Sequence, residues 1–114
     1  NASYLNNALK NIKGIKIPNF KNDQSHVFHQ YTITVEGNFK QTRDELAESL
    51  NKKGVSSAVY YPKPLHLLEH FKKLGYKEGD FPVAEKLSKQ VLSLPIHPHL
   101  TQQQLDTIAN AIKE

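Results

Sequence analysis

The chain of 114 residues contains no cysteine, methionine or tryptophan, and only five glycines. The absence of cysteine excludes disulfide bonds and thiolate chemistry. The glycines are isolated from one another, so the sequence also lacks a glycine-rich loop of the kind that cradles phosphates. No apolar run approaches the roughly 20 residues that a membrane-spanning helix needs. We therefore expect neither a membrane span, nor a phosphate loop, nor redox chemistry at cysteine.

A strong charge of one sign is also missing, because fifteen basic residues stand against eleven acidic ones and the net charge is +4. The lysines are spread along the chain, whereas a nucleic-acid-binding domain usually gathers basic and aromatic side chains on one face. We therefore expect no nucleic-acid partner, although an anionic small molecule is compatible with this charge. The N-terminal stretch NASYLNNALKN has a helix pattern rather than a signal-peptide pattern, so a cytoplasmic location is predicted.

Hydrophobic periodicity predicts one domain over residues 1–114, with a leading helix at 1–13 and an α+β sandwich at 14–114. Capping boxes that begin at Thr42 and Thr101 indicate the starts of two further helices. The predicted helices occupy residues 1–13, 42–54, 67–75, 81–91 and 101–114; the predicted strands occupy residues 15–18, 26–37, 55–61 and 92–95, with a polar turn at 19–25. This order favours the α+β class, as a small antiparallel-type sheet with helices packed on one side.

The longest predicted strand alternates strictly, with Val27, His29, Tyr31, Ile33 and Val35 on one face. Such alternation is typical of a strand that buries one of its faces. A lone histidine on a buried face is usually a hydrogen-bonded core residue, so a structural role is predicted for His29. A functional role beside Tyr31 is the alternative.

A zinc site is the sharpest metal hypothesis, because HLLEH at residues 66–70 matches the H-x-x-E-H pattern of one class of zinc peptidases. On one helix, His66 and His70 could both reach a zinc ion, with Glu69 as the general base. The context argues against it, since Pro64 places His66 at the very start of a short helix. We therefore predict no metal.

Two further histidines, His97 and His99, are separated by Pro98 in an irregular corner, for which a structural role is predicted. The seven serines lie in no nucleophile-elbow context. The residues taken by themselves therefore predict no catalytic group within this chain.

Longer motifs resemble the C-terminal part of the DegT/StrS-type sugar aminotransferases. The resemblance rests on YYPKPLHL and LGYKEGDFPVAEKLSKQVLSLPIHPHLTQQQLDTIANAIKE, and extends upstream to YLNNALKNIKGIKIP, HVFHQYTITV and RDELAESLNKKGV. The ordered set Y-Y-P-x-P-L-H, G-Y-x-x-G-D-F-P-x-A-E and L-S-L-P-x-H-P is far more specific than the five-residue zinc pattern. It covers nearly the whole chain.

The resemblance implies an enzyme that depends on pyridoxal phosphate (PLP) and moves an amino group from an amino-acid donor onto a nucleotide-linked keto sugar, in sugar or polysaccharide biosynthesis. It also implies that the Schiff-base lysine, the partner of the pyridinium nitrogen and most phosphate contacts belong to a large domain for which this chain has no room. The chain is then expected to be a non-catalytic C-terminal fragment that binds no cofactor by itself. Its expected partners are that large domain and a second subunit of a homodimer.

The same resemblance implies that Tyr60, Tyr61 and His66 contact the sugar or its diphosphate. The two tyrosines end a predicted strand, and alternation along a strand would send them to opposite sides, so that only one faces the substrate. Lys63 could add an ionic contact, although exposure to solvent is the simpler expectation. The alternative function is a stand-alone binding or regulatory domain that has this fold without the catalysis.

Overall fold

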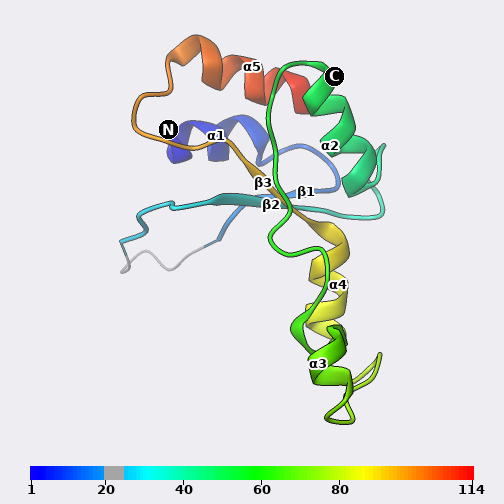
Figure 1. The fold of residues 1–114 in the computed structure, drawn as a ribbon. Helices are drawn as coiled ribbons and strands as arrows, with labels where there is room; N and C mark the ends of the chain where they lie inside the picture. Colours follow the sequence, from blue (N-terminus) through cyan, green and yellow to red (C-terminus); the bar gives the residue numbers. More distant parts are fainter. Residues whose placement is uncertain (20–24) are drawn as a thin grey trace.

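A three-stranded antiparallel sheet is the centre of the fold. The computed structural model describes residues 1–19 and 25–114. The strands lie in the order β1 (Ile15–Lys16), β2 (Tyr31–Val35) and β3 (Val91–Leu94). Three helices cover one face of this sheet (Figure 1), namely α1 (Ala2–Leu9), α2 (Arg43–Lys52) and α5 (Gln102–Lys113). The predicted α+β class, a small antiparallel sheet with helices on one side, is confirmed.

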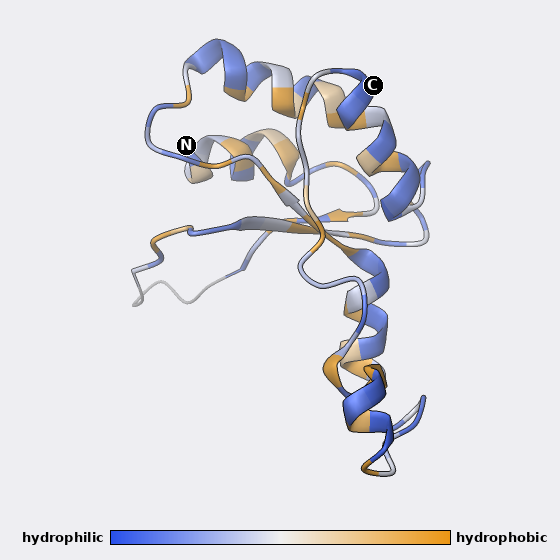
Figure 2. Ribbon diagram, viewed as in Figure 1, coloured by the Kyte–Doolittle hydropathy of each residue, from blue (hydrophilic) through white to orange (hydrophobic). Residues whose placement is uncertain are grey.

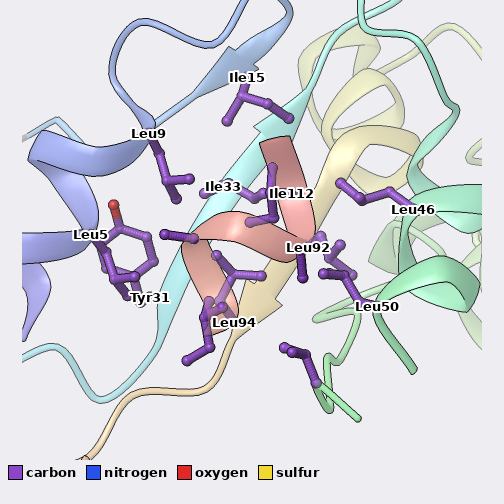
Figure 3. Close-up of a cluster of buried hydrophobic side chains, with 14 of the residues drawn as sticks. Leu5, Leu9, Ile15, Tyr31, Ile33, Leu46, Leu50, Leu92, Leu94 and Ile112 are labelled. Atoms are coloured by element: carbon purple, nitrogen blue, oxygen red, sulfur yellow. The ribbon is translucent and has the colours of Figure 1, made fainter. Parts of the chain in front are cut away.

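The core lies between the sheet and these three helices (Figure 3). Strand β2 alternates as predicted, and its residues Tyr31, Ile33 and Val35 are buried. The Tyr31 hydroxyl donates to Asn6 Oδ1 over 2.7 Å, which gives the one polar atom of this large buried side chain a partner. Burial raises the pKa of the Tyr31 hydroxyl far above its usual value. Leucines and isoleucines supply the rest of the core, among them Leu5, Leu9, Leu46, Leu50, Leu92 and Ile112.

Local capping signals set the starts of two of these helices. Thr42 accepts from the backbone N–H of Glu45 while the Glu45 carboxylate accepts from the backbone N–H of Thr42. Thr101 and Gln104 make the same reciprocal pair before α5. Each pair satisfies N–H groups that have no partner within the helix. Both predicted capping boxes are confirmed.

An arm projects from the opposite side of the sheet (Figure 1). It consists of a short 3₁₀ helix, η1 (Leu65–Leu67), followed by α3 (Glu69–Lys72) and α4 (Pro82–Gln90), and it returns directly into β3. The buried Arg43 holds the root of the arm, because its Nη1 donates to the carbonyl oxygens of Ser88 and Val91 over 3.2 and 3.1 Å. Hydrophobic residues recur along the arm (Figure 2), and several of their side chains are exposed.

Three predicted strands are shorter than the sequence suggests, and the one predicted at 15–18 is reduced to the two residues of β1. The strand predicted at 26–37 covers only β2, since Phe28 has a φ of 48° and interrupts the extended backbone. As a result Val27 is 90% exposed and His29 is also exposed, so the prediction that both face the core is wrong. The strand predicted at 55–61 is reduced to one bridge, between Ala58 and Ser93.

Other predicted boundaries change less. The leading helix ends at Leu9, and the helix predicted at 67–75 is divided into η1 and α3. Most of the polar turn predicted at 19–25 lies outside the described residues. In the part of the chain that is described, no helix is long and apolar enough to cross a membrane.

Replacement of Gly14 by alanine is expected to destabilise the fold. Its φ is 82°, and a Cβ added there would lie 2.6 Å from the Phe39 Cα. Gly54 has a similar φ of 77°, but a Cβ there would meet nothing within 4 Å. Gly54→Ala should therefore cost about 1 kcal/mol for the left-handed backbone alone, and Gly14→Ala about 2–4 kcal/mol because the backbone of Phe39 must also move.

Urea unfolding of the chain followed by circular dichroism measures both costs, and the wild-type transition should be cooperative. Equal losses of unfolding free energy in the two variants would show that the contact with Phe39 does not constrain the fold.

Candidate functional site

A loop from Ala58 to His66 connects the edge of the sheet to the arm. At one end, the Ala58 N–H donates to the Ser93 carbonyl over 3.0 Å and the Ser93 N–H donates to the Ala58 carbonyl over 2.8 Å. Pro62 and Pro64 lie within the loop, and each fixes its own φ. The loop is therefore attached to β3 by its backbone and is stiff in its middle.

Tyr60 and Tyr61 lie side by side at the outer part of this loop. Their side chains are 47% and 74% exposed, and their ring centroids are 5.8 Å apart in an edge-to-face arrangement. The expectation that they point to opposite sides is wrong, because this segment forms no strand and the alternation rule does not apply to it. The two phenol rings form one surface that can meet a ligand together.

A hollow of about 300 Å³ lies beside Tyr60. Its polar lining residues include His29, Ser56, Ser57, Tyr60 and Ser93, and apolar residues such as Leu94, Pro95 and Ile96 complete the lining. Hydroxyl groups and an imidazole can both donate and accept hydrogen bonds, so the hollow suits a ligand that carries hydroxyl groups. His29 therefore lies at this hollow, and not in the core where the sequence predicted it.

His66 lies at the other end of the loop and is buried. Its Nε2 is 2.9 Å from Glu85 Oε1, and its ring packs against the Phe81 ring with a centroid separation of 4.9 Å. The same carboxylate oxygen accepts from the backbone N–H of Gly79 over 2.8 Å and from that of Phe81 over 3.3 Å. Glu85 thus joins the loop to the turn that precedes α4.

The electrostatics of Glu85 reflect these bonds. Burial raises the pKa of the Glu85 carboxyl, but the hydrogen bonds from His66, Gly79 and Phe81 together lower it by more. The pKa of Glu85 therefore lies below its usual value of 4.5. The charged carboxylate is the form that accepts all three bonds, so it is the form that the fold stabilises.

The zinc geometry considered for residues 66–70 does not form. His66 lies in η1 against Glu85, whereas Glu69 and His70 are exposed on α3. His97 and His99 are exposed in their corner, with ring centroids 6.5 Å apart. Among the described residues, no group of three or more histidines and acids could hold a metal ion.

The described lysines also do not suit a PLP cofactor. A lysine that forms a Schiff base is usually desolvated or held beside another charge, which lowers its pKa. Every lysine of the described residues is exposed. The residues present therefore do not fit a PLP site within this part of the chain.

Comparisons with known protein sequences and structures all point to one protein family. The sequence model of the DegT/DnrJ/EryC1/StrS aminotransferase family matches residues 1–113. The chain is 48% identical over 89 residues, 78% of its length, to a protein of Geobacillus stearothermophilus named pleiotropic regulatory protein, of which it covers 23%. It is 36% identical over 113 residues, 99% of its length, to the dTDP-3-amino-3,4,6-trideoxy-alpha-D-glucose transaminase of Streptomyces venezuelae, of which it covers 28%.

A solved structure shows the same relationship. The crystal structure of DesV from S. venezuelae superposes with a TM-score of 0.89 at 34% identity, over 98% of this chain and 29% of that one. The chain spans 23% of the length of the first of these curated relatives and 28% of the second. The relatives are therefore several times longer than the chain.

Glu85 is the contact residue that reasoning from the residues missed. It was visible only as the last letter of the motif G-Y-x-x-G-D-F-P-x-A-E, with no chemical role attached to it. His66 and Glu85 are 19 positions apart, so no helical or strand periodicity relates them. Only the fold brings them together.

The lowered pKa of Glu85 has a consequence for stability in acid. A carboxyl whose folded pKa is lowered stabilises the fold above its unfolded pKa, near 4.5, and loses that contribution as the pH falls through the folded value. A carboxyl-detected NMR titration of the chain should therefore give Glu85 a midpoint below 4.5. The amides of Gly79 and Phe81, which donate to it, should shift over the same pH range. A midpoint above 4.5 would mean that burial dominates and the three bonds are weak.

Proposed function

The chain belongs to the DegT/DnrJ/EryC1/StrS aminotransferase family, and we propose that it is the C-terminal domain of a PLP-dependent aminotransferase acting on a nucleotide-linked keto sugar. The observation that carries this proposal is the match over residues 1–113 to relatives that are several times longer, one of them named as a dTDP-sugar transaminase. Cofactor chemistry belongs to the part of the protein outside this chain, in keeping with the exposure of every described lysine.

The domain contributes a wall of the substrate cleft. Tyr60 and Tyr61 face the substrate, since they are exposed, adjacent and carried by a loop that the sheet and two prolines hold in place. A tyrosine hydroxyl can donate to a phosphate oxygen and can donate to or accept from a sugar hydroxyl. His66 as a direct substrate contact stays a prediction, because its ring lies buried between Glu85 and Phe81.

The exposed apolar face of the arm supports docking onto the remainder of the same protein. Large side chains exposed there are Leu65, Leu74, Tyr76, Phe81, Val83 and Leu87. So many exposed apolar side chains on one short segment are unusual on an isolated domain and typical of a surface that another part covers. The large domain is the proposed occupant, because the relatives have more than two thirds of their length outside the matched region. The homodimer partner, the amino-acid donor and the cytoplasmic location stay predictions.

A binding or regulatory domain without catalysis is the second candidate. It is favoured by the relative named pleiotropic regulatory protein, to which the chain is 48% identical. The two candidates differ in the reading frame that encodes the chain. A frame with a large upstream domain that contains a PLP-binding lysine supports the enzyme, and amination of a nucleotide-linked keto sugar by the purified full-length protein establishes it. A frame that encodes little beyond these residues supports the second candidate.

Removal of a tyrosine hydroxyl from the loop should raise the KM for the sugar substrate. In the full-length protein, Tyr60→Phe and Tyr61→Phe each remove one hydroxyl while the ring remains. The KM for the nucleotide-linked sugar should rise about threefold to tenfold in at least one of them, the expected effect of losing one hydrogen bond. Steady-state kinetics with the sugar and the amino donor varied separately measure the effect.

Tyr4→Phe is the control, since it removes the same hydroxyl from a tyrosine of α1 that lies outside both the loop and the arm and whose partner is Asp106 of α5. It should leave that KM unchanged within about twofold. Unchanged sugar kinetics in both loop variants of an active enzyme would remove Tyr60 and Tyr61 from the proposed site.

A further inference from the structure

The loop that carries Tyr60 and Tyr61 is attached to the rest of the domain at both of its ends. At the first end, two backbone hydrogen bonds join Ala58 to Ser93 of β3. At the second end, the attachment is made by the His66 side chain, whose Nε2 lies 2.9 Å from Glu85 Oε1 and whose ring packs against the Phe81 ring. The prolines between these ends restrict the chain, so the two attachments together determine where the tyrosine rings lie.

Glu85 is well placed to act as the second anchor. Its side chain is only 13% exposed, and it lies on α4, whose C-terminal end is joined to the body of the domain by the bond from Arg43 to the Ser88 carbonyl. The N–H groups of Gly79 and Phe81 donate to the same carboxylate oxygen that meets His66. These backbone donors hold the carboxylate in the orientation in which it meets His66, so the position of His66 depends on that of α4.

We propose that Glu85 is a positioning residue, which holds the Tyr60–Tyr61 pair in place for the nucleotide-linked sugar through its contact with His66. This inference rests on the proposed function and deepens it, because it assigns part of the sugar affinity to a residue that need not touch the sugar. The Ala58 attachment is made by backbone atoms and survives any side-chain change. The hydrogen bond from His66 to Glu85 is the polar attachment of the loop that a side-chain substitution can remove.

The test uses Glu85→Ala, Glu85→Gln and the control Glu69→Ala in the full-length protein. Glu85→Ala removes every bond of the carboxylate. Glu85→Gln keeps an oxygen that can accept from Gly79, Phe81 and His66, and removes only the charge. Glu69 is an exposed carboxylate on α3 of the same arm, so its replacement removes a charge without touching the anchor.

Hydrogen–deuterium exchange read by mass spectrometry reports the anchor without reference to activity. In peptides that cover residues 59–68, the Leu67 and Leu68 amides donate within the turn of η1 and are protected. Glu85→Ala should increase exchange there, and Glu69→Ala should not. Exchange that is unchanged in Glu85→Ala would overturn the proposal, because the loop would then be held by other contacts.

Kinetics report the consequence for the substrate. Glu85→Ala should raise the KM for the nucleotide-linked sugar by about tenfold or more, as expected when a charge-assisted hydrogen bond is lost. The KM for the amino donor should change less than about twofold, a split that a general loss of folded enzyme would not produce. Glu85→Gln should recover most of the sugar affinity and most of the exchange protection.

Two further outcomes separate this proposal from the proposed function. Faster exchange with an unchanged sugar KM would overturn the positioning role while leaving the aminotransferase intact. A wild-type protein that neither aminates nor binds nucleotide-linked sugars would overturn the proposed function, and the positioning role with it, even if the exchange data show that Glu85 anchors the loop.

Discussion

Strand β3 joins the body of the domain to the loop of residues 58–66, and it does so with only four residues. One edge pairs with β2, from Tyr31 opposite Leu94 to Thr34 opposite Val91. On its other edge it holds Ala58, where the loop begins. Its leucines at 92 and 94 are buried in the core, and its first residue follows α4 without a linker. The core therefore fixes β3, and β3 fixes both the loop and the root of the arm.

Polar contacts hold the arm in one orientation, which hydrophobic packing alone would not specify. Arg43 is buried, and its guanidinium satisfies carbonyl oxygens at the junction of α4 and β3. Glu85 makes similar contacts further along the arm, where its carboxylate accepts hydrogen bonds from the His66 side chain and from two backbone N–H groups. A charge that is buried, as in Arg43, or mostly shielded from solvent, as in Glu85, would be costly without these partners, so each contact holds its segments in one arrangement. These contacts therefore help to determine where the exposed side chains of Tyr60 and Tyr61 lie.

Sequence patterns predicted the parts of the fold that depend on neighbouring residues. Thr42 and Thr101 cap their helices through atoms three positions away, and both helices start where these caps indicate. The inward residues of β2 also follow from alternation. Alternation failed at Phe28, whose left-handed backbone ends the pattern and turns His29 outward. It failed again at residues 55–61, because a strand needs a partner along its length and β3 offers only one bridge there.

The candidate site could be located from sequence only through the family motif, since no residue spacing relates Tyr60, His66 and Glu85. The resemblance indicated which loop faces a ligand, but neither the pairing of the two tyrosine rings nor the burial of His66. Those features arise from contacts between segments that are distant in the sequence. For the same reason, the contact between Glu85 and His66 could not be predicted from the sequence, because it forms only when α4 lies against the end of the loop.

The central claim is that this chain shapes a substrate cleft while the cofactor is held elsewhere in the protein. It is tested most directly by treating both the full-length protein and the isolated chain with PLP and borohydride, followed by peptide mass mapping. The account predicts one stoichiometrically modified lysine in the full-length protein, outside residues 1–114, and no stoichiometric modification of the isolated chain. Stoichiometric modification of a single lysine within residues 1–114 would contradict it.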